Sequence, residues 1–314
     1  MVAAQNILMI QLRQLGDILL TTPCLRAIKA DNPQHRISFL THSMGREILR
    51  DSPYLDELIT YNDKTRLAYC ALAFSLRQRK FTLVFDFMAN PRSASLAWLT
   101  RCPRRYAFST KRNWAFTHII PRQIDSDYIV REKFELLKAA GFSPQDESLL
   151  MPWDTADLAP YQELLAHDAF RLAPMHIALS PTHRRENRRW PLASYITLAE
   201  RLVREKNAAV VWTWGPGEEA IIDELIRSCA VPTFKSPRTN LRQLTALLAQ
   251  LELFIGNANG ASHFAVAAGC ATLKLCGPHT EAQAWSPLTH QHRIVKAWDD
   301  IKNLSVETVW SAIC

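Results

Sequence analysis

The amino-acid sequence predicts an α/β protein of two domains, each a doubly wound parallel sheet with helices on both faces. Three observations carry this prediction. The 314 residues are enough for two domains of ordinary size. Short apolar segments alternate with amphipathic segments in each half of the chain, as they do in β-α-β units. Residues 151–175 interrupt this alternation with three prolines, and it resumes after them.

The first half is expected to open on the apolar strand 6–12 and to continue with three more strands. The helix that follows the first strand has a stop signal at Asn32-Pro33. The later helix is amphipathic, with apolar residues on one face. The expected strands are 6–12, 36–42, 55–62 and 81–87, and the expected helices are 20–31 and 65–80.

The second half repeats the same rhythm after one short helix within 151–175. The expected strands are 176–181, 208–214, 251–257 and 271–277, and the expected helices are 192–206, 218–229, 240–250 and 261–269. We therefore place a first domain at residues 1–155, a linker at 156–171 and a second domain at 172–314. A helix at the C-terminus could return to the first domain.

Composition excludes several classes of protein. Hydrophobic residues make up 48% and charged residues 21% of the chain, which is typical of a globular protein with its own core. The seven cysteines are scattered and form no C-x-x-C pair, so neither a disulfide framework nor a zinc site is expected. The N-terminus lacks the pattern of a signal peptide, and no apolar run approaches the ~18 residues of a spanning helix. We expect a cytoplasmic protein, with peripheral contact with a membrane surface as a further possibility.

The positive charge lies entirely in the first half. Residues 1–150 contain 21 lysines and arginines against 14 acids, whereas residues 151–314 contain 16 of each. One stretch of the first half holds cations and no acid: Arg101, Arg104, Arg105, Lys111, Arg112 and Arg122. This excess is either a solvated face or a platform for a polyanion such as nucleic acid, a phospholipid surface or an acidic glycan.

Glycine placement predicts a ligand-binding edge in the second domain. Six of the nine glycines lie between residues 215 and 277, mostly just after expected strands. Glycine lets the backbone approach a ligand closely, and ligands of open α/β sheets bind beyond the carboxyl ends of the strands. The second domain therefore resembles a nucleotide-binding domain. It has neither a G-x-G-x-x-G nor a P-loop motif, which argues against dinucleotide cofactors and P-loop chemistry.

Asp17 is the candidate catalytic residue of the first domain. It stands with Gly16 where the first strand gives way to a helix. An aspartate there can cap the helix. In the same place its carboxylate can accept a proton from a bound hydroxyl group.

Three segments of the second domain are candidates for binding a nucleotide. Residues 256–269 place His263 in the first turn of a small-residue helix, where backbone N–H groups suit phosphate, although the histidine can also be a core or capping residue. Residues 180–191 carry four arginines, which suit phosphate or simply form a solvated loop. Glu218 or Glu219 can accept two ribose hydroxyls, or these acids can simply suit a helix N-terminus.

Seven segments resemble motifs of the bacterial lipopolysaccharide heptosyltransferases, glycosyltransferase family 9. They are LGDILLTTP (15–23), DSPYLDELI (51–59), DFMANPRS (86–93), RRWP (188–191), WGPGEE (214–219), NANGASHFAVAAG (257–269) and CGPHT (276–280). The family motifs are similar to LGD-hydrophobic-x-x-TTP, DNPYIDEVI, D-L-Q-x-N-x-R-S, K-x-W-P, GGPxE, N-D-S-G-x-x-H-x-A-A-A and FGPT. The resemblance extends over about residues 5–310.

The resemblance implies a GT-B architecture, in which two Rossmann-like domains face a central cleft. It implies an inverting, metal-independent transfer of heptose from a nucleotide sugar, ADP-heptose, to the lipopolysaccharide core, with no other cofactor. Asp17 would be the general base. The donor-binding residues would be Ser180, Thr182, Arg188, Glu218, Asn259, Gly260, Ser262 and His263. An anionic acceptor would meet the first domain at Arg92, Arg104, Arg105 and Lys111.

The chain departs from the family pattern at the donor site. Ala258 replaces the acid of N-D-S-G, Asn259 replaces the small hydroxyl residue, and Arg188 replaces the lysine of K-x-W-P. The loss of a carboxylate at Ala258 leaves two alternatives open: another nucleotide sugar, or a non-catalytic protein that binds a glycan or a partner. A nucleic-acid-binding protein ranks last, because the aromatic and basic residues do not alternate in a stacking pattern.

Overall fold

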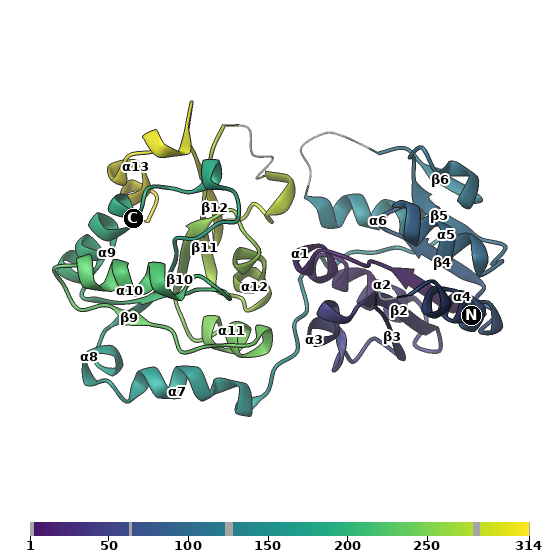
Figure 1. Ribbon diagram of the computed structural model, residues 1–314, viewed down its shortest axis with the longest axis horizontal. Helices are drawn as coiled ribbons and strands as arrows, with labels where there is room; N and C mark the ends of the chain where they lie inside the picture. Colours follow the sequence, from purple (N-terminus) through teal and green to yellow (C-terminus); the bar gives the residue numbers. More distant parts are fainter. Residues whose placement is uncertain (1–2, 63–64, 123–127, 279–282, 314) are drawn as a thin grey trace. The chain divides into compact units, whose positions relative to one another are not determined.

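The computed structural model describes residues 3–62, 65–122, 128–278 and 283–313. The chain forms two compact units, and the boundary falls between Pro152 and Trp153. Each unit contains one six-stranded sheet in which all paired strands run parallel. Figure 1 shows the helices that accompany each sheet. The predicted fold class of two doubly wound α/β domains is confirmed.

The first unit has the strand order β3-β2-β1-β4-β5-β6. This is the order of a Rossmann sheet, with β1 and β4 at the point where the order reverses. Its strands are β1 (Asn6–Ile10), β2 (Arg36–His42), β3 (Glu57–Tyr61), β4 (Leu83–Asp86), β5 (Arg105–Phe108) and β6 (His118–Ile120). Its helices are α1 (Leu15–Leu19), α2 (Thr22–Asp31), α3 (Arg46–Leu49), α4 (Arg66–Gln78), α5 (Pro91–Leu99) and α6 (Ile129–Ala139).

Helices cover both faces of this sheet, and successive side chains of the central strands are buried on alternate faces. Leu8 and Ile10 of β1 pack in one core with apolar residues of α4 and α5. Helices α2 and α6 contact each other on the other face. Local signals fix where the helices begin. Asn90 caps α5 by accepting hydrogen bonds from the backbone N–H groups of Arg92 and Ser93, and Pro91 occupies the first turn.

The second unit has the order β12-β11-β10-β7-β8-β9, which is the same topology counted from β7. Its strands are β7 (Met175–Ser180), β8 (Ala208–Trp212), β9 (Phe234–Lys235), β10 (Leu253–Asn257), β11 (Ala271–Cys276) and β12 (His292–Lys296). Its helices are α7 (Ala159–Leu165), α8 (Asp168–Arg171), α9 (Leu192–Lys206), α10 (Glu219–Ser228), α11 (Leu241–Leu248), α12 (Ala261–Ala267) and α13 (Val306–Ser311).

The C-terminal helix α13 packs against α9 of the second unit, where Val309 and Trp310 join the buried core. Arg201 of α9 lies 4.1 Å over the Trp310 ring and strengthens this contact. The segment expected to be a linker contains a 3-10 turn (Thr155–Leu158) as well as α7 and α8. Arg242 of α11 anchors this turn through a 2.9 Å ion pair with Asp157.

Every strand and helix expected from the sequence is present; β2 and α9 have the expected ends, and the ends of the others are shifted. The ranges expected from the sequence leave out β5, β6, β9, β12, α1, α3, α5, α6 and one of the two short helices α7 and α8. The missed strands are short or interrupted by charge; β5 begins with Arg105 and β12 with His292-Arg293. Neighbouring strands, rather than their own apolar pattern, hold them in the sheet. Among the described helices, none has the length and apolar character needed to cross a bilayer.

Candidate functional site

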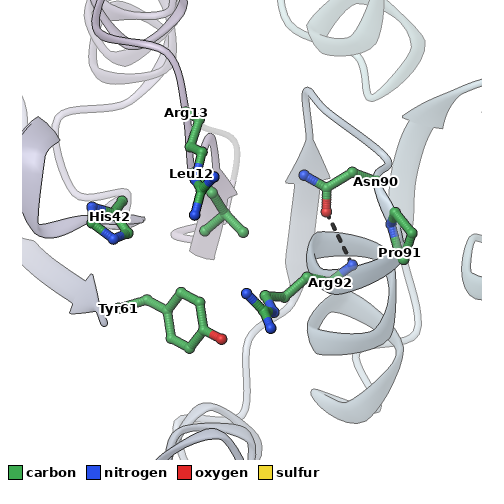
Figure 2. Close-up of a pocket in the computed structure, with 7 residues that line it drawn as sticks. All are labelled: Leu12, Arg13, His42, Tyr61, Asn90, Pro91 and Arg92. Atoms are coloured by element: carbon green, nitrogen blue, oxygen red, sulfur yellow. Dashed lines mark hydrogen bonds between the residues drawn. The ribbon is translucent and has the colours of Figure 1, made fainter. Parts of the chain in front are cut away.

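A pocket of about 320 Å³ opens at the carboxyl edge of the first sheet, and Figure 2 shows its lining. Residues that end or follow β1, β2, β3 and β4 form it: Leu12, Arg13, His42, Tyr61, Asn90, Pro91 and Arg92. Parallel strands bring these four ends to one edge, which is where open α/β sheets bind ligands.

Two arginines and a histidine line this pocket. Arg13, His42 and Arg92 come from three different strand ends, and the Arg92 guanidinium lies 5.4 Å over the Tyr61 ring (Figure 2). Guanidinium groups recognise carboxylate and phosphate through paired N–H donors. The pocket is therefore suited to an anionic group on a ligand. Of its lining residues, the sequence had identified Arg92 alone, because His42 and Tyr61 lie in strands with no separate motif.

The turn before Arg92 depends on a buried carboxyl group. Asp86, the last residue of β4, accepts hydrogen bonds from the N–H groups of Met88 and Ala89 over 3.0 and 2.9 Å. Burial raises the pKa of Asp86 to about 6, although these hydrogen bonds act in the opposite direction. Asp86 thus shapes the turn that carries Asn90 and Arg92 into the pocket.

Asp17 lies in the short helix α1, four residues after Arg13. Its Oδ2 atom accepts a hydrogen bond from the backbone N–H of Gln14 over 3.2 Å, which completes a capping box. Its Oδ1 atom accepts no hydrogen bond from the part of the chain that the structure describes. The capping role is therefore present, and one carboxylate oxygen remains available for a substrate proton.

A buried lysine supports the loop between β1 and α1. Lys133 of α6 is 5% exposed, and its Nζ donates to Oε1 of Gln11 over 3.3 Å. The amide nitrogen of Gln11 donates to the carbonyl of Arg13. Burial lowers the pKa of Lys133, and the Asp17 carboxylate opposes this shift more than any other group. No sequence motif marks Lys133, because it occupies a position in the buried stripe of α6, between Val130 and Leu137.

The structure separates Arg104 and Arg105 from this pocket. Both stand at the start of β5, and Arg104 donates to the side chain of Gln5, which precedes β1, over 2.8 Å. The starts of parallel strands lie at the edge opposite to their carboxyl ends, so these arginines do not share a binding surface with Arg92. Lys111 follows β5 in an exposed turn and does not line the pocket. Arg104, Arg105 and Lys111 therefore stay predicted acceptor residues, and they lie outside this pocket.

In the second unit, four predicted donor-binding residues meet beyond the ends of β7, β8 and β10. The Nδ2 atom of Asn259 donates to Ser180 Oγ over 3.1 Å and to the Thr182 carbonyl over 2.9 Å. The Thr182 hydroxyl in turn donates to Glu218 Oε2 over 2.7 Å. Glu218 also accepts from the N–H of Gly215 over 2.8 Å, so it organises the turn after β8.

Two glycines near this cluster have opposite surroundings: Gly256 is closely packed, and Gly260 faces open space. A Cβ atom at Gly256 would lie 2.8 Å from Ser180 Cβ, so only glycine lets β10 approach β7 here. A Cβ at Gly260 would meet no atom of the described structure within 4 Å. Ser262 is buried, and its hydroxyl donates to the Asn259 carbonyl over 2.7 Å. Gly260 therefore borders the free space, while Ser262 fixes the turn.

His263 and Arg188 differ in their environment. Burial, with the positive charge of Lys274 added to it, lowers the pKa of His263 well below its usual range, so the ring is neutral at pH 7. Lys274 itself is buried on β11 and donates to the Trp285 carbonyl over 2.9 Å. Arg188 ends a 3-10 turn, and its guanidinium has no partner among the described residues. His279 and Thr280 of the CGPHT segment lie outside these residues.

The curated proteins similar to this chain include lipopolysaccharide heptosyltransferases. The chain is 26% identical to lipopolysaccharide heptosyltransferase 3 of Escherichia coli K12 over 306 residues, which cover 91% of this chain and 86% of that protein. It is 22% identical to lipopolysaccharide heptosyltransferase 2 of Salmonella typhimurium over 313 residues, covering 93% and 88%.

Solved structures match the fold of the whole chain. A family 9 glycosyltransferase from Veillonella parvula superposes with a TM-score of 0.85 at 19% identity, covering 98% of this chain and 95% of that one. The E. coli heptosyltransferase WaaC with ADP gives a TM-score of 0.79 at 16% identity, covering 98% of each chain. These neighbours place the two-unit fold in the GT-B class. Residues 69–309 match the sequence profile of glycosyltransferase family 9 (heptosyltransferase), and the chain therefore belongs to this family of glycosyltransferases.

Proposed function

We propose that the protein transfers a heptose from ADP-heptose to an anionic sugar of the lipopolysaccharide inner core, with inversion and without a metal ion. The cationic pocket carries the acceptor part of this proposal, since Arg13, His42 and Arg92 line it together. Relatives named lipopolysaccharide heptosyltransferase, and a neighbour solved with ADP-2-deoxy-2-fluoro heptose, support the donor and acceptor classes. The acceptor would be met at the cytoplasmic side of the membrane.

In the proposed reaction, the free carboxylate oxygen of Asp17 accepts the proton of the acceptor hydroxyl. The hydroxyl oxygen forms a bond to the anomeric carbon of the heptose, and the bond from that carbon to the phosphate oxygen breaks. ADP leaves with the electron pair of this bond. Arg188, which has no protein partner among the described residues, would neutralise charge on the departing diphosphate.

The polar cluster of the second unit supports nucleotide binding. Glu218 already accepts two hydrogen bonds at one carboxylate oxygen, from Thr182 and from Gly215, so its second oxygen is the one that would face a ribose hydroxyl. Ser180 and Asn259 fix the adjoining turns, and Gly260 borders the open space. Asn259, whose side-chain amide links these turns, directly follows Ala258, the position at which the family motif has an acid.

Two alternatives follow from Ala258: a different nucleotide sugar, or binding without catalysis. The full chain titrated calorimetrically with ADP-heptose, UDP-glucose and GDP-mannose separates the first from the proposal. Transfer to a soluble, delipidated inner-core oligosaccharide, with and without EDTA, separates the second. We expect binding and transfer with ADP-heptose alone, unchanged by EDTA. Tight binding of another nucleotide sugar, or binding of ADP-heptose without transfer, would overturn the proposal.

A further inference from the structure

Two tryptophans of the first unit form an exposed pair away from the pocket. Trp98, near the end of α5, is 50% exposed, and Trp114, in a 3-10 turn between β5 and β6, is 60% exposed. Their ring centroids lie 6.1 Å apart at an interplanar angle of 71°. Neither residue lines the cationic pocket, and large apolar side chains that pair on a surface mark an interaction site.

The chain around this pair has positive charge only. From residue 87 to residue 122 there are seven arginines and lysines and no aspartate or glutamate. Arg101 is exposed three residues after Trp98, and Lys111 is exposed three residues before Trp114. Arg105 donates through Nε to the carbonyl of Ala115 over 2.8 Å, which holds its guanidinium beside the turn that bears Trp114.

We propose that Trp98 and Trp114, with Arg101 and Arg105, form a docking surface for a bilayer that contains anionic lipids. Indole rings are large apolar groups with one polar N–H, and they favour the headgroup region of membranes. Each basic side chain near an anionic bilayer raises the affinity about fivefold. The near-perpendicular rings cannot hold a nucleic-acid base between them, which favours lipid over a single-stranded polynucleotide.

This inference deepens the proposed function, because a lipid-linked acceptor must be reached at a membrane surface. It also gives a role to Arg105, which the sequence analysis had assigned to the acceptor and the structure places at the opposite edge of the sheet. The two surfaces of the first unit would then bind different parts of a lipid-linked acceptor. The carboxyl-edge pocket would take the sugar, and the tryptophan surface would take the lipid headgroups.

Vesicle sedimentation of the full chain tests the surface directly. Phosphatidylcholine vesicles with and without phosphatidylglycerol would be compared for the wild type, the double variant Trp98→Ser/Trp114→Ser and the control Trp298→Ser. Trp298 is 97% exposed and lies in the second unit, which has no net charge. We expect the wild type to bind the anionic vesicles and to be released by salt. The double variant should bind roughly tenfold more weakly, and the control should match the wild type.

The single variant Arg101→Asn isolates the charge, since asparagine tolerates the positive φ of 56° at this position. It should weaken binding to anionic vesicles severalfold and leave binding to neutral vesicles unchanged. Three results would overturn the proposal. The wild type could show no preference for anionic vesicles, or Trp298→Ser could lose as much vesicle binding as the double variant. In the third, the double variant keeps vesicle binding but loses binding to a single-stranded oligonucleotide. Transfer to the soluble acceptor, measured on the same double variant, should be unchanged, so failure of the docking surface and failure of the proposed activity give different results.

Discussion

The ammonium group of Lys133 in α6 donates a hydrogen bond of 3.3 Å to the side chain of Gln11, 122 positions earlier in the chain. Gln11 passes this support to the carbonyl of Arg13, directly before the capped helix that bears Asp17. A single buried side chain therefore fixes the loop from which both the pocket arginine and the candidate base arise. The Phe87 ring, 5.1 Å from the ammonium group, packs against the same lysine.

Replacing Lys133 with Met should lower kcat about tenfold and leave the donor Kd unchanged, because a hydrogen bond from a charged group to the Asp17 loop is lost. The same loss should shrink markedly when Gln11 is already alanine, since the two residues act as one unit. Steady-state kinetics of the two single variants and the double variant measure this coupling. Lys138→Met, on the exposed side of the same helix, is the matched control. Strictly additive effects would show that Lys133 does not act through Gln11.

Asp17→Asn should reduce transfer by about 10²–10⁴-fold with little change in donor affinity, because an amide cannot take the acceptor proton. Asparagine keeps an oxygen that can accept from the N–H of Gln14, so the cap of α1 is preserved. Single-turnover transfer and calorimetry with the donor are the two measurements. A variant with more than about a tenth of wild-type turnover would leave Asp17 with the capping role alone.

Arg188→Ala should weaken donor binding tenfold to a hundredfold, since a charge-assisted hydrogen bond to phosphate contributes about 1.5–3 kcal/mol. Calorimetric titration with the nucleotide sugar checks this value. Arg184→Ala, an exposed arginine of the same loop, serves as the control. Equal affinities for wild type and Arg188→Ala would assign this guanidinium to the solvated loop.

Arg92→Ser should raise the KM for a soluble anionic acceptor and leave the donor KM alone. Arg105→Ser, at the opposite edge of the same sheet, should change neither value with this acceptor. Added salt should raise the wild-type acceptor KM, because charges at a solvent-accessible pocket are screened beyond about 8 Å at physiological ionic strength. If salt and both substitutions leave the acceptor KM unchanged, the pocket does not bind the anionic group.

Lys274→Met should stabilise the protein by roughly 1–4 kcal/mol at pH 6, because a buried charge is replaced by an apolar chain of similar length. Burial lowers the pKa of Lys274 to about 7. Between this value and the unfolded pKa of 10.5, the unfolded chain binds more protons, so wild-type stability rises with pH. The gain in the variant should therefore be largest below pH 7 and fall as the pH rises toward 10. Denaturant unfolding at pH 6 and pH 9 measures it, with the exposed Lys302→Met as control.

The sequence predicts the two parallel sheets well because their central strands are continuous apolar runs such as residues 7–10, which only a sheet covered on both faces can bury. It predicts Arg92, Glu218 and Asn259 because each follows a strand within a recognisable motif. It cannot predict the meeting of Arg13, His42 and Tyr61, because the strand order brings these residues together and no local pattern records that order. For the same reason the sequence cannot show that Arg104 and Arg105 lie at the edge of the sheet opposite to Arg92.

The order of the central strands along the chain also decides when each strand meets its partner during synthesis. In the first unit, Ile7 of β1 pairs with Leu83 of β4, 76 positions later, and Leu253 of β10 pairs with Ile177 of β7 across the same interval. The fully buried side chains of β1 therefore leave the ribosome well before one of their two neighbours exists. Until β4 emerges, one edge of this apolar strand has no partner, so the nascent chain exposes an unpaired strand edge that is prone to aggregation.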